Sequence, residues 1–178
     1  MTLLLAAGFL TASFATSAVR ADEGAEVRAL ITRGDLPAAM ARVDQAITEQ
    51  PRNAPLRFLR GVVLMDLARD TEALEAFTRL TQEHPDLPDP YNNIGLLQAR
   101  AGRPDAALAA LQQALRADPS HRTARANLGQ VYLMLAAQAW DALARSGPLD
   151  PNLHRKLEAV RALLAPRPSA TASREPAR

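Results

Sequence analysis

The stretch of sequence that decides the fold is PDPYNNIGLLQARAGRPDAALAALQQALRADPSH, residues 88–121. It holds two apolar stripes whose members are three and four residues apart, which is the spacing of one face of an α-helix. Between the stripes, Gly102 suits the left-handed cap that ends a helix, and Pro104 suits the first turn of the next helix. The stretch therefore predicts two antiparallel helices. The stripes are Tyr91, Ile94, Gly95 and Leu97, then Ala107, Leu111 and Ala114.

The same hairpin recurs along the chain with a period of 34 residues, since Pro51, Pro85 and Pro119 stand at equal intervals (85 − 51 and 119 − 85). Gly95 is expected to lie opposite Ala107, because a residue without a side chain lets two helix backbones approach closely. A single hairpin has apolar surface left over, so the units are expected to stack into an all-α fold, an α-solenoid of antiparallel helix pairs. Other positions that keep this step are Ala39, Ala73 and Ala107; Val43, Phe77 and Leu111; and Gly61, Gly95 and Gly129.

The fourth unit opens like the others and then loses its turn. Where a glycine-containing loop belongs, the sequence runs LMLAAQAWDALAR. We therefore expect one long helix over Thr123–Arg145, broken at Ser146-Gly147-Pro148. Asp150 suits the N-cap of a last helix, which is expected to close the open end of the stack. The apolar residues that recur at helical spacing in this last helix are Leu153, Leu157, Val160 and Leu164.

Residues 88–121 resemble the tetratricopeptide repeat family at nearly every diagnostic position, and residues 54–87 and 20–53 resemble it in part. Within residues 54–87, Arg57 and Arg60 replace apolar residues that the pattern expects. The resemblance extends to exported bacterial tetratricopeptide proteins of the cell envelope. It implies about three repeat units, a degenerate fourth and a C-terminal capping helix, together forming one solenoid domain over residues 22–165.

The N-terminus has the pattern of a secretory signal. From Leu3 to Val19 the chain carries no charge, and an apolar first half is followed by small residues. We predict a signal peptide over residues 1–21, cleavage after Ala21 and a periplasmic location, with no membrane span left after cleavage. An uncleaved N-terminal membrane anchor is the alternative. At the other end, residues 166–178 are rich in Pro, Ala, Ser and Arg, a composition that predicts a disordered tail.

Composition and missing motifs exclude several classes of function. The chain has no cysteine, so it forms neither disulfides nor thiolate metal sites. The net charge is only +2, and the arginines alternate with acidic residues, which argues against a nucleic-acid partner. His84, His121 and His154 are scattered, and no hydrolase or nucleotide-binding motif is present. We therefore predict a protein that is not an enzyme and that uses no metal or cofactor.

The first helix of each stacked hairpin lines the concave surface, so its outward positions are the predicted contacts for a partner. Asn93 and Asn127 occupy one repeat position, and the family resemblance implies that such asparagines hydrogen-bond a peptide backbone. A role in satisfying local backbone groups is the alternative for both. The predicted partner-binding residues are Phe58, Val62 and Met65; Asn92, Asn93, Leu96 and Arg100; and Asn127, Gln130 and Leu133.

Two interpretations of the whole chain remain open. The first is a periplasmic adaptor or scaffold that binds a peptide or a helix of an envelope protein in its concave groove. The alternative is a structural or oligomerisation module, accessory to peptidoglycan or envelope assembly, which pairs with a second copy and leaves the groove unfilled. Trp140, the one tryptophan, is expected to pack the long helix against the last one, with an exposed anchor for a partner as the alternative.

Overall fold

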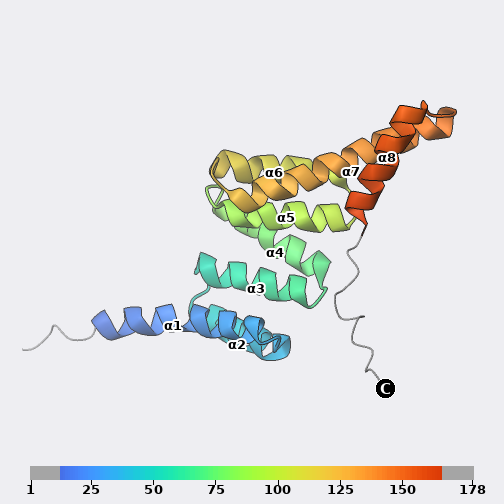
Figure 1. Cartoon of the computed structure of the whole chain (residues 1–178). Helices are drawn as coiled ribbons and strands as arrows, with labels where there is room; N and C mark the ends of the chain where they lie inside the picture. The colour runs from blue at the N-terminus through green and yellow to red at the C-terminus, as the bar shows by residue number, and fades with distance from the viewer. Residues whose placement is uncertain (1–12, 166–178) are drawn as a thin grey trace, which may run out of the picture. The chain divides into compact units, whose positions relative to one another are not determined.

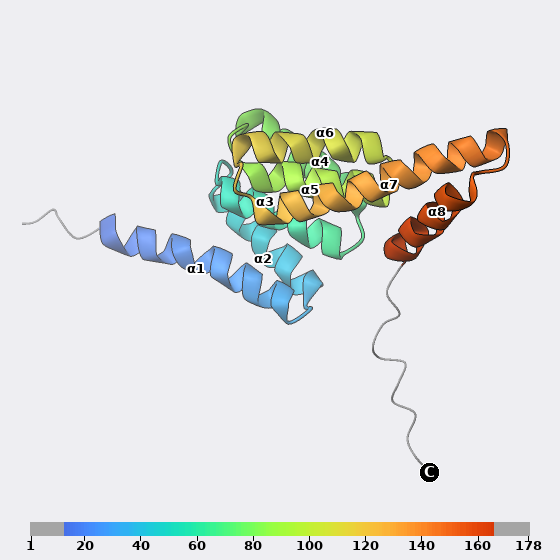
Figure 2. The ribbon, with the colours of Figure 1, turned by 45° about the horizontal axis from the view of Figure 1, so that its top comes forward.

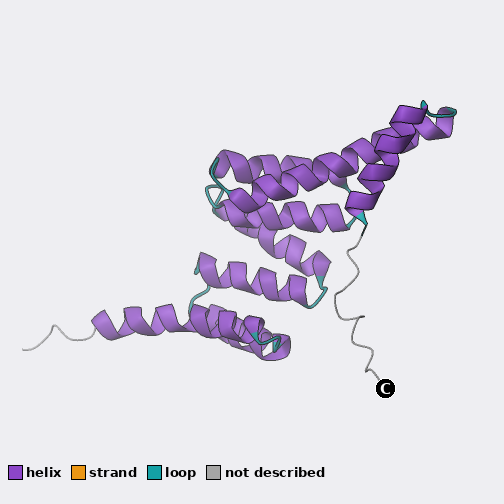
Figure 3. Ribbon diagram, viewed as in Figure 1, coloured by secondary structure: helices purple, strands orange, loops and turns teal. Residues whose placement is uncertain are grey.

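The computed structural model describes residues 13–165, and within them the chain forms eight α-helices and no strand (Figure 1). Figure 3 shows these helices joined by short loops. The predicted all-α class is therefore confirmed. The helices are α1 (Ser13–Thr32), α2 (Leu36–Glu49), α3 (Ala54–Asp66), α4 (Asp70–Glu83), α5 (Pro88–Arg100), α6 (Pro104–Ala117), α7 (Arg122–Ser146) and α8 (Pro151–Leu164).

The predicted export segment and tail lie partly or wholly outside the described residues. Residues 1–12, which hold much of the predicted signal peptide, and residues 166–178, the predicted disordered tail, are not described. The predicted cleavage site after Ala21 lies within α1. Across residues 13–165, none of the helices combines the length and the apolar content that crossing a membrane requires. Export and cleavage stay predictions.

The chain divides into two compact units, Met1–Pro90 and Tyr91–Arg178. In the first unit, α1 pairs with α2 and α3 pairs with α4, while α3 also contacts α1 and α2. Side-chain caps begin two of these helices: the Asp35 carboxylate accepts from the Ala38 amide at 3.2 Å, and the Asn53 amide oxygen accepts from the Leu56 amide at 3.2 Å. The apolar core between α1, α2 and α3 consists of Val27, Ala39, Val43, Ala46, Leu56, Leu59 and Val63.

Three hairpin turns share one backbone conformation at the period of the repeat. Gly34, Ala68 and Gly102 have φ angles of 77°, 56° and 69°, which lie in the left-handed region. At Ala68, the Arg69 amide donates to the Leu64 carbonyl at 2.9 Å, which closes the helix end in a Schellman-type cap. The predicted left-handed cap at Gly102 is thus confirmed. The repeat over residues 54–87 makes the same turn with alanine at position 68.

Two repeat glycines lie where a side chain would collide with the second helix of the hairpin. A Cβ atom on Gly61 would lie 2.5 Å from Cε1 of Phe77. A Cβ atom on Gly95 would lie 2.6 Å from Cγ of Leu111 and 3.4 Å from the carbonyl oxygen of Ala107. This confirms the close approach predicted for Gly95 and Ala107. The third glycine of the series, Gly129, differs, because a Cβ atom there would meet nothing within 4 Å.

In the second unit, the long helix predicted over Thr123–Arg145 is confirmed as α7, which ends at Ser146. Its N-terminal half packs on α5 and α6 through a core cluster of apolar residues. The Asp150 carboxylate caps α8 as predicted, accepting from the Asn152 and Leu153 amides at 2.8 and 3.2 Å. The buried members of the cluster are Ala107, Leu111, Ala114, Ala124 and Val131.

The last helix, α8, packs on α7, the last helix of the repeat array, which is the position predicted for a C-terminal capping helix. It folds back along the C-terminal half of α7 (Figure 2), where Leu157 and Val160 pack against Ala137. Trp140 joins this cluster, which is the first of its two predicted roles. α8 covers only this half of α7 because the chain reverses only after Ser146, and the 14 residues of α8 at about 1.5 Å each reach back about half of α7.

Candidate functional site

Three asparagines form a chain of hydrogen bonds between α5 and α7 in the second unit. The Asn127 amide group donates to the Asn92 side-chain oxygen at 2.8 Å, and the Asn92 amide group donates to the Asn93 side-chain oxygen at 3.3 Å. Asn92 is only 5% exposed, whereas Asn93 and Asn127 are half-buried. The two first helices of adjacent repeats are therefore joined at the position where peptide contacts were predicted.

This arrangement uses only part of each terminal amide. The bond to Asn92 uses a donor of Asn127, and the bond from Asn92 uses the oxygen of Asn93. A side-chain amide carries two N–H donors and one carbonyl oxygen that can accept twice. The Asn93 NH2 group and the Asn127 oxygen are therefore outside this chain of bonds. One can donate to a peptide carbonyl and the other can accept from a peptide N–H. Both bonds of this chain join side chains, so the alternative role in satisfying local backbone groups stays a prediction.

The other predicted residues of the second unit have different environments. Arg100 and Gln130 are exposed and Leu96 is half-buried. Leu133 packs with the cluster between α7 and α8, so part of its surface is already covered. Asn92 was predicted as an outward contact, but the structure places it in the interior because it bridges Asn93 and Asn127. Its role in the structure is to position the other two amides.

The three predicted residues of the first unit all lie on α3. Phe58, Val62 and Met65 are half-buried. The Phe58 ring packs against Phe77 of α4, with 5.6 Å between ring centroids and 51° between ring planes. Phe58 also lines a cavity of about 400 Å³, so its remaining face is accessible. The cavity is lined further by Arg28, Ala54, Pro55, Leu59, His84, Leu87, Asp89 and Pro90.

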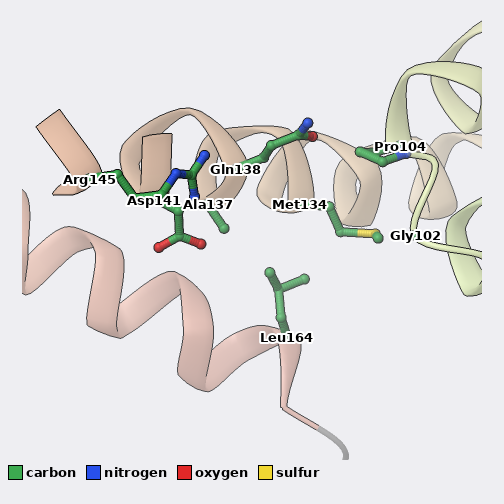
Figure 4. Close-up of a pocket in the computed structure, with 8 residues that line it drawn as sticks. All are labelled: Gly102, Pro104, Met134, Ala137, Gln138, Asp141, Arg145 and Leu164. Atoms are coloured by element: carbon green, nitrogen blue, oxygen red, sulfur yellow. The ribbon is translucent and has the colours of Figure 1, made fainter. Parts of the chain in front are cut away.

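A second cavity, of about 330 Å³, lies between α7, the end of α8 and the turn that joins α5 to α6. Figure 4 shows Met134 and Leu164 reaching toward each other on its apolar side and Asp141 and Arg145 farther along α7. Sequence reasoning missed this cavity because it depends on where α8 packs. Gly102, Pro104, Ala137 and Gln138 complete its lining.

The two arginines that depart from the repeat pattern form ion pairs on the first unit. Arg57 donates two hydrogen bonds to the Glu83 carboxylate, one of them at 2.8 Å, and Arg60 donates to Asp44 at 2.7 Å. The hydrogen bond from Arg57 is the main reason that the pKa of Glu83 lies below its ordinary value. These charges join α3 to α4 and to α2. These two arginines therefore have a structural role.

Among the residues that the structure describes, no group of three or more His, Cys, Asp or Glu side chains could hold a metal ion.

Comparisons with known proteins agree with this architecture. A family model described as "Tetratricopeptide repeat" matches residues 25–88 and 92–151. Among solved structures, the first TPR domain of human RPAP3 is similar, with a TM-score of 0.62 and 14% identity over 67% of this chain and 94% of that one. The first TPR of Spaghetti (RPAP3) bound to the HSP90 peptide SRMEEVD gives a TM-score of 0.60 and 14% identity over 66% of this chain and 93% of that one. The crystal structure of the MamA protein is similar with a TM-score of 0.56 and 21% identity over 71% of this chain and 70% of that one.

Proposed function

The chain belongs to the tetratricopeptide repeat family, and from that premise we propose that it is an exported scaffold that binds a peptide segment or a helix of a cell-envelope protein. The binding surface in the second unit is the side of α5 and α7 that carries Asn93, Arg100, Asn127 and Gln130, called here the amide face. In the first unit, Phe58, Val62 and Met65 of α3 supply apolar contacts. The protein acts by holding its partner and performs no reaction on it.

The observation that carries this proposal is the hydrogen-bonded chain Asn127–Asn92–Asn93. It holds two amides in fixed positions, which lowers the entropy that binding would otherwise cost. One amide group and one carbonyl oxygen then match the alternating donors and acceptors of a peptide backbone. The similar folds of Spaghetti, bound to an HSP90 peptide, and of the second RPAP3 domain, in complex with the HSP70 peptide SGPTIEEVD, support a peptide as the ligand.

An internal segment or a helix suits the amide face better than a C-terminal carboxylate. Recognition of a terminal carboxylate in this family uses several basic residues on the first helices. Among the predicted contacts of this chain, Arg100 alone is basic. Neutral amides and apolar side chains make up the rest of the set, so they favour backbone hydrogen bonds and apolar anchors over ion pairing.

Photocrosslinking tests the amide face. A photoreactive residue is placed at Gln130, which is exposed on α7, and for comparison at Gln112, which is exposed on α6. We expect Gln130 to capture a discrete protein partner and Gln112 to capture none. Adding Asn93→Ala and Asn127→Ala to the Gln130 variant should reduce the adduct at least about tenfold, since each lost hydrogen bond weakens binding by about 1 kcal/mol or more.

Circular dichroism of the double variant checks that the helices persist. No adduct at Gln130, the same adduct at Gln112, or an undiminished adduct in the double variant would each rule out the amide face as the binding surface.

The proposed location rests on the uncharged run Leu3–Val19, whose apolar first half is followed by a second half rich in small residues. Expression of the full chain in a bacterial host, followed by mass measurement of the periplasmic fraction, tests it. We expect a mature protein that begins at Asp22. Recovery of the intact chain in the membrane fraction would favour the N-terminal anchor, and recovery in the cytoplasm would contradict export.

A further inference from the structure

One side of α7 carries a continuous stripe of apolar and small residues, called here the α7 seam. Its members are alternately three and four residues apart, which is the spacing of a coiled-coil contact line. Tyr132 is 51% exposed and Leu143 is 50% exposed, and they are two of the three exposed large hydrophobic residues in the described part of the chain. The α7 seam consists of Gly129, Tyr132, Ala136, Ala139 and Leu143.

The α7 seam is a separate side of the helix. At about 100° per residue, it points about 100° away from Ala124 and Val131, which pack on α5 and α6. The same rule places Leu133 and Ala137, which contact α8, on the side opposite Ala124. Asn127 and Gln130 of the amide face lie about 160° and about 140° from the α7 seam. Neither the core of the second unit nor α8 therefore occupies this surface.

The repeat pattern explains why this surface is open. In the preceding units, Gly61 lies against Phe77 and Gly95 lies against Leu111, in each case on the second helix of the same hairpin. Gly129 has the same place in the fourth unit, yet α7 continues without a turn, and a methyl group on Gly129 would meet nothing within 4 Å. The α7 seam is thus the contact surface of a repeat whose second helix is missing.

We propose that the α7 seam binds the α7 seam of a second copy of this chain in an antiparallel, two-fold symmetric helix pair. A two-fold axis brings identical surfaces together, so each must complement itself. In the antiparallel pairing that aligns large with small residues, Tyr132 faces Ala136 of the other copy and Gly129 faces Ala139. The small residues Gly129, Ala136 and Ala139 let the two backbones approach closely, as Gly95 does opposite Ala107 within a hairpin.

Charge favours the antiparallel direction, because Arg145, the basic residue of the last turn of α7, lies about 160° from the α7 seam. Arg122 and Arg125 lie in the first turns of α7, and the first turn has no acidic residue. Their positive charges are therefore next to the positive end of the helix dipole, which is unfavourable. An antiparallel partner brings the carbonyl end of its own α7 beside these arginines, and Arg125 then lies next to Leu143 of the partner, whose side chain can cover the arginine stem. A parallel pair would place four arginines together at one end, which like-charge repulsion disfavours.

Sedimentation velocity of the full chain over about 10 µM to about 1 mM tests the pairing, a range suited to an interface as small as one helix pair. We expect a monomer–dimer equilibrium in the wild type. Ala139→Glu should raise the dissociation constant at least about tenfold, because it puts a charge at a close contact. Ala159→Glu makes the same change at an exposed position of α8 and should have no effect.

A wild type that stays monomeric throughout the range, or equal weakening by Ala139→Glu and Ala159→Glu, would overturn the proposal. The photocrosslinking result at Gln130 is separate, since Ala139→Glu should leave partner capture by the amide face unchanged.

Cysteine crosslinking tests the direction and register, and it is clean because the chain has no cysteine of its own. Tyr132→Cys and Ala136→Cys variants are oxidised alone and as an equal mixture. Antiparallel pairing predicts that the mixed dimer forms at least about fivefold faster than either same-residue dimer, because facing Cβ atoms meet the distance that a disulfide needs. Faster same-residue dimers would show a parallel pair, and crosslinking no faster than that of Gln112→Cys on α6 would exclude the α7 seam.

Discussion

One of the three left-handed hairpin turns has alanine where the other two have glycine. Gly34, Ala68 and Gly102 adopt one left-handed conformation, and only alanine has a Cβ atom that this conformation crowds. We expect Ala68→Gly to raise the free energy of unfolding by about 0.5–1 kcal/mol. Glycine removes the strain of the left-handed conformation, but it also makes the unfolded chain more flexible, which offsets part of the gain. Urea denaturation followed by circular dichroism measures it.

The matched change is Gly102→Ala, which should lower the free energy of unfolding by about 1 kcal/mol. A Cβ atom there would have nothing within 4 Å, so the loss would come from the backbone alone. If both substitutions change stability in the same direction, the turn conformation is not the cause.

Gly95 and Gly129 hold one repeat position and should respond to alanine with opposite signs. Gly95→Ala puts a methyl group 2.6 Å from Cγ of the buried Leu111, and we expect a loss of about 1–3 kcal/mol in the free energy of unfolding. Gly129→Ala meets no neighbour and should gain up to about 1 kcal/mol from helix propensity. Thermal denaturation at low protein concentration compares them, and a loss at Gly129 would show that this side of α7 is covered.

At the scale of helices, the ion pair between Arg57 and Glu83 links α3 to the end of α4. The hydrogen bond from Arg57 lowers the pKa of Glu83 in the folded state. A lowered folded pKa means that the carboxylate stabilises the fold above its unfolded pKa and that this stabilisation is lost as the pH falls through the folded pKa. We therefore expect the wild type to lose more stability than Glu83→Gln between pH 7 and pH 3.

Urea denaturation at both pH values measures the difference. Both side chains are partly solvent-exposed, so the effect should be modest and should shrink in high salt. An equal loss in the two proteins would mean that the pair contributes nothing to folding.

The helices were more predictable than the way they pack. Spacings of three and four residues located the hairpins, and the lack of a breaker in LMLAAQAWDALAR located α7. These are local properties of the chain. The sequence predicted that α8 caps the array but not which part of α7 it meets, because apolar spacing along α8 says only which of its sides is buried.

The candidate site was predictable only to the level of repeat position. Asn93 and Asn127 follow from the 34-residue step, but the interior place of Asn92 depends on a hydrogen bond to a residue 35 positions away. The ion pairs of Arg57 and Arg60 likewise join separate helices, so their spacing in sequence gave no signal.

At the scale of the whole molecule, a repeat array is held together by contacts between neighbouring elements, so its ends differ from its interior. In the second compact unit, the boundary between the repeat array and its C-terminal end falls inside α7. The N-terminal half of α7 packs on α5 and α6, while the C-terminal half packs on α8 through a cluster with three buried residues, Ala137, Leu157 and Val160. The two halves therefore depend on different neighbours.

Hydrogen exchange of the intact chain should reveal this division. We expect amides of α8 and of α7 beyond Ala137 to exchange faster than those around Ala124–Val131, because local opening follows the number of buried contacts. Asp150→Ala removes two capping hydrogen bonds at a cost of about 1 kcal/mol and should speed exchange only in α8 and the second half of α7. Equal protection along all of α7, unchanged by Asp150→Ala, would mean that the helix opens as one unit. In that case the α7 seam would be rigid over its whole length, whereas graded protection would mean that pairing with a second copy also orders its C-terminal half.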